Sequence, residues 1–208
     1  MSESVEKNNG TAKKRPGIKI AVISAFYALI IALLCAVTIF FMWKNGAFLP
    51  RYITWNNQED TYNISEENVL FSLKRKRLKI TNAESKELIY KTPKEWLVSD
   101  FFVTDIDSDG TDDVIMMVWK QGSFGKYKPF WHDEKDNKWT QHIFIFEWNK
   151  EREDRLKPMW MSSGLGIKVH KVYVDEKSRV HFTDDAGEET VWQWINWGLT
   201  LVEVIPAK

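Results

Sequence analysis

The chain has 208 residues with 29 basic and 29 acidic side chains, so its formal net charge is zero. This length accommodates one domain plus an anchor, and the balanced charge argues against a nucleic-acid binder. The single cysteine, Cys35, excludes a disulfide within the chain.

The first element in chain order is an uncharged run from Ile20 to Trp43. A helix of this length crosses a hydrocarbon core of about 30 Å at 1.5 Å per residue. The run is longer than the apolar core of a cleaved signal peptide, typically about 7–15 residues. It also lacks a convincing small-residue cleavage site after it. The sequence therefore predicts an uncleaved transmembrane signal anchor over residues 18–44.

Basic residues flank this anchor unequally. Four precede it and one follows closely: Lys13, Lys14, Arg15, Lys19 and Lys44. The positive-inside rule then predicts a short cytoplasmic tail over residues 1–17 and an extracytoplasmic domain over residues 45–208. A single-pass anchor with this orientation is typical of a bacterial cell-surface protein in the cell membrane.

After the anchor, short runs of β-branched and aromatic residues alternate with polar turns, which predicts antiparallel strands and no further helix. Strands are expected at 51–55, 69–73, 78–81, 87–91, 96–104, 113–119, 142–148, 156–161, 167–174, 179–183 and 191–198. The polar stretch 58–67 is expected to be a loop. The basic cluster Lys74 to Arg77 is interpreted as a solvated hairpin tip, or alternatively as a contact with anionic lipid or polymer. No basic-aromatic RNA-binding motif accompanies it.

An acidic turn separates two of these strands. Asp105, Asp107 and Asp109 alternate, Gly110 follows, and Asp113 completes a nine-residue D-x-D-x-D-G-x-x-D pattern. Four carboxylates this close repel one another unless a cation lies among them, and Ca²⁺ takes six to eight hard oxygen ligands. Gly110 supplies the positive φ that a loop around an ion needs, and the backbone carbonyl of Thr111 is a further candidate ligand.

The order strand, acidic loop, strand resembles the calcium-loop segment of FG-GAP or VCBS-type repeats, the blades of integrin-like β-propellers. The resemblance covers one blade, residues 69–120, and implies that Asp105, Asp107, Asp109 and Asp113 are Ca²⁺ ligands. The chain departs from the family in having only one such loop and in lacking the Phe-Gly and Gly-Ala-Pro marks.

The strands number about twelve, which corresponds to about three four-stranded blades, whereas closed propellers have about four to eight. The predicted fold class is therefore all-β: blade-like antiparallel strands, arranged as a partial propeller or as compact twisted sheets. Association of several copies, as a homo-oligomer, is a further alternative.

Residues 121–138 form a long polar insertion with two aromatic residues, Phe130 and Trp131. His132, Asp133 and Glu134 within it suggest an acid-base or metal site, but adjacent side chains of an extended segment point to opposite faces. An exposed polar loop is the simpler interpretation.

Two histidines and a tryptophan motif complete the candidate residues. His170 and His181 have no acidic partner at ligand spacing and are interpreted as packing or surface histidines. Trp192 and Trp194 share one face of a strand at about 7 Å spacing, which suits a platform for sugar rings, with Trp131 as a third member. The alternative is that these indoles fill the core.

The sequence contains no nucleophile-base pair, zinc spacing or phosphate loop. The expected function is therefore a non-catalytic, membrane-anchored surface domain with a structural Ca²⁺, which binds a protein partner or serves as an accessory subunit of an envelope complex. The alternatives are envelope-glycan binding through exposed Trp residues and, third, an enzyme that uses the insertion.

Overall fold

A computed structural model describes residues 17–124, 136–153 and 155–207. The chain divides into two compact units, residues 1–48 and 49–208. The first unit contains α1 (Gly17–Lys44), and its segment Ala21–Lys44 is long and apolar enough to cross a membrane. This agrees with the predicted apolar helix over residues 18–44. The predicted tail, residues 1–17, lies outside the described residues except for Gly17.

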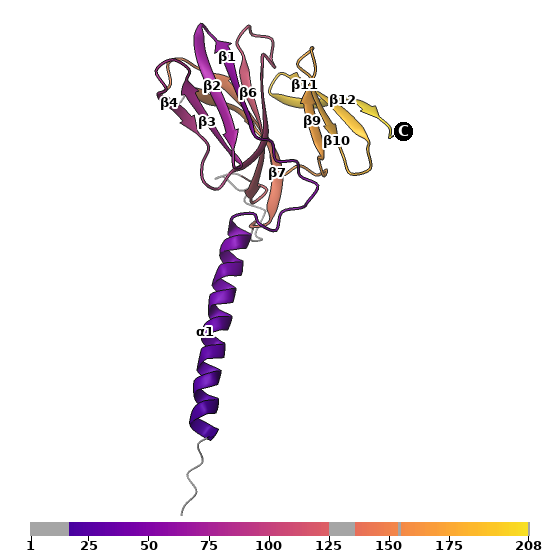
Figure 1. Cartoon of the computed structure of the whole chain (residues 1–208). Helices are drawn as coiled ribbons and strands as arrows, with labels where there is room; N and C mark the ends of the chain where they lie inside the picture. The colour runs from indigo at the N-terminus through magenta and orange to yellow at the C-terminus, as the bar shows by residue number, and fades with distance from the viewer. Residues whose placement is uncertain (1–16, 125–135, 154, 208) are drawn as a thin grey trace, which may run out of the picture. The chain divides into compact units, whose positions relative to one another are not determined.

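The second unit is built from twelve strands in three four-stranded antiparallel sheets (Figure 1). The total agrees with the predicted count of about twelve, but the strands at 58–64 and 198–205 were not among the predicted ranges. The first sheet comprises β1 (Gln58–Ile64), β2 (Glu67–Lys74), β3 (Arg77–Asn82) and β4 (Leu88–Lys91). The middle sheet comprises β5 (Leu97–Thr104), β6 (Asp113–Gln121), β7 (Trp139–Trp148) and β8 (Leu156–Met161). The third sheet comprises β9 (Lys171–Val174), β10 (Val180–Thr183), β11 (Glu189–Ile195) and β12 (Gly198–Ile205).

Each sheet is a meander in which every strand pairs with the next one along the chain. Tight turns connect several of these strands. Ser65 and Glu66 between β1 and β2, and Arg75 and Lys76 between β2 and β3, all have positive φ. Two consecutive residues of this kind form the two-residue turn that matches the twist of a hairpin. The basic cluster is thus a hairpin tip, as predicted.

The middle sheet packs between the other two, and Figure 1 shows β1–β4 and β9–β12 on opposite sides of β6 and β7. Side chains of a strand alternate between faces, and β6 shows the consequence. Val114 and Met116 pack into a first core with the first sheet, whereas Ile115 and Met117 pack into a second core with the third sheet. A strand buried on both faces needs a continuous apolar run, which the sequence of β6 provides.

Aromatic rings fill the first core. Phe71 of β2 stacks on Phe101 of β5 with ring centroids 5.4 Å apart, and both side chains are almost fully buried. Burial of one such side chain contributes about 1.5–3 kcal/mol. This contact holds the first sheet on the middle sheet, at the strand that leads into the acidic loop.

The prediction for the segment after the anchor is wrong. Residues 51–55 are not a strand, and the polar stretch 58–67, expected to be a loop, contains β1. Ile53 packs instead beside Leu97 and Trp119 in a third small cluster. The predicted strand 167–174 is also too long, because β9 begins at Lys171.

The insertion is described only in part. Residues 125–135, which include Trp131, His132, Asp133 and Glu134, lie outside the described residues.

Candidate functional site

The acidic loop connects β5 to β6 at one end of the middle sheet. Carboxylate oxygens of Asp105, Asp107 and Asp109 lie within 4.8 Å of one another, one from each residue. Asp105 and Asp107 are half-buried and Asp109 is exposed. The structure therefore brings together three of the four predicted aspartate ligands.

Backbone amides of the loop donate to the same carboxylates. The amide of Asp109 donates to Asp105 Oδ1 at 3.0 Å, and that of Gly110 donates to Asp105 Oδ2 at 2.9 Å. The Thr111 amide donates to Asp109 Oδ1 at 2.8 Å. This wrapping needs left-handed backbone, and Gly110 has φ of 91°, as predicted, with Ser108 at 63°.

Asp113 stands apart from this cluster at the start of β6. It is 2% exposed, and its Oδ2 accepts a hydrogen bond from the Ile106 amide at 3.2 Å. Burial is the main reason that the pKa of Asp113 rises to about 7, and the charges of Asp107 and Asp109 add to the rise. Burial, followed by the charge of Asp109, likewise raises the pKa of Asp107.

These properties fit a hard cation. Crowded, partly desolvated carboxylates favour protonation or a positive neighbour, and oxygen donors in an irregular loop match Ca²⁺. Asp105, Asp107 and Asp109 would hold the ion directly. The neighbouring Asp112, which the motif does not use, has a pKa raised by burial and then by the charge of Asp105. Asp112 is thus a further acidic group close to the cluster.

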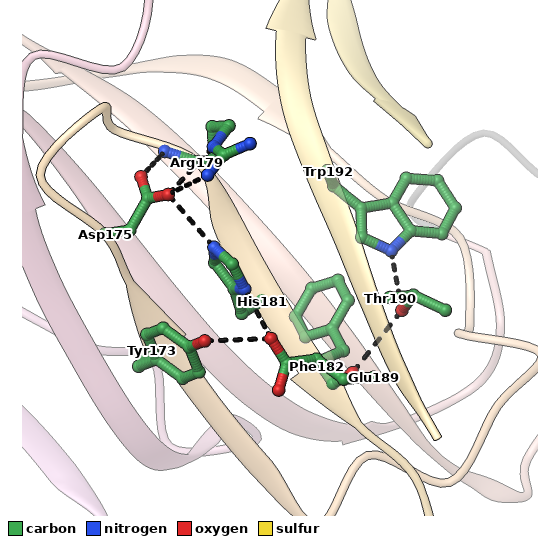
Figure 2. Close-up of polar contacts among 8 residues, drawn as sticks. All are labelled: Tyr173, Asp175, Arg179, His181, Phe182, Glu189, Thr190 and Trp192. Carbon is green, nitrogen blue, oxygen red and sulfur yellow. Dashed lines mark hydrogen bonds and ion pairs between the residues drawn. The ribbon is translucent and has the colours of Figure 1, made fainter. Parts of the chain in front are cut away.

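A second polar cluster lies on the third sheet (Figure 2). His181 of β10 is 6% exposed, and its ring lies between two carboxylates. Nδ1 is 2.7 Å from Glu189 Oε1, and Nε2 is 3.1 Å from Asp175 Oδ2. Both ring nitrogens thus lie within hydrogen-bond distance of a carboxylate oxygen, and the ring links the two acidic side chains.

Neighbouring side chains complete this network. Tyr173 stacks on the His181 ring at 4.3 Å, and its hydroxyl donates to Glu189 Oε1 at 2.8 Å. The hydrogen bonds from His181 and then Tyr173 hold the pKa of Glu189 below its usual value. Partial burial opposes ionisation of Asp175, but hydrogen bonds from Arg179 and His181 outweigh it and lower the pKa of Asp175.

The sequence interpretation of the two histidines therefore needs correction for His181. Its acidic partners lie six and eight residues away, and the antiparallel pairing of β10 with β9 and β11 brings them to the ring. A prediction of the register of these two hairpins would have identified the acidic partners of His181. His170 does pack, because its ring stacks on Tyr52 at 4.3 Å.

Two of the three platform tryptophans are described. Trp192 and Trp194 are half-buried and pack against the second core, and Trp192 Nε1 donates to Thr190 Oγ1 at 2.9 Å (Figure 2). This placement fits the alternative in which these indoles complete the core. Trp197, in the next turn, is 80% exposed.

Comparisons with protein-family models, with curated proteins and with solved structures found no match.

Proposed function

We propose that this protein is a membrane-anchored, extracytoplasmic β domain that binds a protein partner and holds one structural Ca²⁺ in the loop 105–113. The apolar helix α1 supports the anchor. The excess of basic residues before it supports a cytoplasmic N-terminus.

The observation that carries the binding function is β12, the edge strand of the third sheet. Among the described residues it pairs only with β11, and Leu201, Val202, Val204 and Ile205 are each at least 38% exposed. Soluble proteins blunt such edges with charge or proline, but β12 carries only Glu203. An exposed apolar edge strand is a surface that another chain covers.

The calcium role explains how the loop tolerates its charge. A cation that binds only the folded state stabilises it by mass action, by about 2.7 kcal/mol at a concentration 100 times Kd. For a domain of this size, that corresponds to a rise in melting temperature of about 5–10 °C.

The calcium test is thermal unfolding of the full chain in detergent micelles, in EDTA and in millimolar Ca²⁺. Asp107→Asn keeps an acceptor for the Asp109 amide but removes a charge, and should abolish most of the Ca²⁺-dependent shift. The matched control is Asp184→Asn, because Asp184 Oδ1 accepts two turn amides at 2.8 and 2.9 Å outside the acidic cluster. Equal Ca²⁺-dependent shifts in melting temperature in both variants would show that the loop is not the calcium site.

The partner test is photo-crosslinking in native membranes with a benzophenone amino acid at Val202, compared with Lys79, which is exposed on β3. A discrete adduct is expected from Val202 only, and Leu201→Lys should abolish it. An adduct of twice the 24.5 kDa chain mass would identify a second copy as the partner. The same adducts from both positions would refute β12 as the binding surface.

A further inference from the structure

Two open cavities run along β5 and share Asp100. One, of about 340 Å³, extends from Asp100 towards His170 and towards Tyr173 of β9. The other, of about 530 Å³, extends along β5 to Thr104 and is lined across from it by Tyr62 of β1. The two cavities are together called the groove: residues 99–104 of β5 line it, with residues 53–62 and residues 169–176 around them.

A β-bulge places Asp100 in this groove. The register of β5 against β6 shifts between Val98 and Asp100, so that Val98 pairs with Val118 and Asp100 pairs with Met117. In a regular strand, residues two apart share a face. Because of the shift, Val98 packs in the first core, whereas Asp100 lies on the Met117 face, beside the third sheet.

Hydrogen bonds hold the Asp100 carboxylate, but no cation neutralises it among the described residues. Asn56 Nδ2 donates to Oδ2 at 2.7 Å, and the Phe101 amide donates to Oδ1 at 2.9 Å. Burial outweighs both contacts and raises the pKa of Asp100 to about 6. A positive charge in the groove would therefore be bound by a carboxylate that lacks an ion-pair partner.

The rest of the groove favours the same ligand chemistry. Asp60 and Glu176 are exposed on its walls, and Lys171 is the one positively charged side chain among its described lining residues. Asp175 contributes little, since Arg179 and His181 already pair with it. The groove therefore carries net negative charge along β5.

One lining group also lacks a hydrogen-bond partner. His170 Nε2 is buried and unpaired among the described residues, although nearly all buried polar atoms in folded proteins are paired. The lining of the two cavities follows β5 from Ser99 to Thr104, which suits an extended chain better than a compact metabolite.

We propose that this groove binds an extended segment of a partner protein that carries Lys or Arg side chains, one of which pairs with Asp100. This inference specifies the type of partner for the proposed binding function, and it rests on that function. The surface is distinct from β12, because β9 and β12 are opposite edges of the third sheet.

The test is fluorescence anisotropy with the full chain in nonionic micelles and a labelled peptide of alternating Gly and Lys, nine residues long. Asp100→Asn should weaken binding at least tenfold. Glu84→Gln removes the same charge from an exposed turn of the first sheet and should change affinity less than twofold. Lys171→Gln removes the opposing charge and should tighten binding.

Protonation gives an independent readout. The charged or titratable groups that line the groove with Asp100 are Asp60 and Tyr62 from β1, Lys171 and Tyr173 from β9, and His170, Asp175 and Glu176 from the segments that flank β9. Ionisation of Asp100 should strengthen peptide binding about tenfold between pH 5 and pH 7.5. The Asp100→Asn variant should lose most of this pH dependence. That loss would assign the pH dependence to Asp100 and not to the other groups.

Equal losses in Asp100→Asn and Glu84→Gln would overturn the proposal, because they would indicate nonspecific attraction to an acidic surface. Binding of n-butylamine at Asp100 as tightly as the peptide would also overturn it, since the occupant would then be a small amine. Neither result would affect crosslinking at Val202, so failure of the groove is distinguishable from failure of the proposed function.

Discussion

Replacement of Asp100 by Asn should stabilise the protein at neutral pH and not at acid pH. Burial raises the pKa of Asp100 from 3.8 to about 6 in the folded chain. The native state therefore binds the proton more readily than the unfolded state, and stability falls as pH rises from about 4 to about 6. Above pH 6 the full penalty of the buried charge is present.

The size of the effect follows from that shift. Each pKa unit corresponds to about 1.36 kcal/mol, so the penalty is at most about 3 kcal/mol at pH 7.5. Asn cannot accept from both Asn56 and the Phe101 amide, and the loss of one hydrogen bond costs about 1 kcal/mol. With solvent screening of this half-buried group, a net gain of about 1–2 kcal/mol remains.

The assay is thermal unfolding of wild type and Asp100→Asn, full chain in micelles, followed by tryptophan fluorescence at pH 4 and pH 7.5. A rise of roughly 3–6 °C is expected at pH 7.5. At pH 4 the gain should vanish or change sign, because the wild-type carboxyl is then largely protonated. A change in stability that is the same at both pH values would refute the reasoning.

Three further predictions concern other parts of the domain. His181→Leu removes the ring that contacts both carboxylates and should lower the free energy of unfolding in urea by about 2–3 kcal/mol, whereas Tyr173→Phe, which removes one partly exposed hydrogen bond, should lower it by about 1 kcal/mol; similar losses would contradict the central role of the His181 ring. Replacement of Arg75 and Lys76 by Asn-Gly should raise the free energy of unfolding in urea by about 0.5–1 kcal/mol, because both residues have positive φ. A loss of stability would refute that turn geometry. Trp197→Ser should change the unfolding free energy by less than about 0.5 kcal/mol, since the ring is 80% exposed, and a larger loss would show that it packs.

Strands with strong alternation or continuous apolar runs were predictable from sequence. In β2, Val69, Phe71 and Leu73 alternate with outward residues, and the observed burial follows that pattern. In β6 the unbroken apolar run predicted a strand, and the two-sided burial explains why it is unbroken. The alternating pattern and the continuous apolar run both result from packing between sheets, and both can be read from the residues of a single strand.

Strand β1 was missed for the opposite reason. It is an edge strand of sequence QEDTYNI, and only Ile64 in it is fully buried. Its position depends on pairing with β2 across the Ser65–Glu66 turn. A polar edge strand whose stability comes from its partner carries little local signal, so composition alone indicated a loop.

The acidic loop was predictable because its residues are contiguous, whereas the groove and the His181 network were not. Asp100 faces the groove only because of the bulge in β5, and strict alternation with Val98 would have placed it in the first core. His181 meets Asp175 and Glu189 only through the registers of two hairpins. Prediction of a site that depends on strand register or on a bulge requires knowledge of which residues pair across the strands.

The three-sheet stack also determines where binding surfaces are available. The middle sheet has both faces covered, and each outer sheet has one face packed against it. The proposed binding surfaces lie at strand edges and connections: the loop between β5 and β6, the groove along β5, and the free edge of β12. Substitutions at Asp107, Asp100 and Val202 should consequently alter calcium binding, peptide binding and partner crosslinking one at a time, while the two cores remain intact.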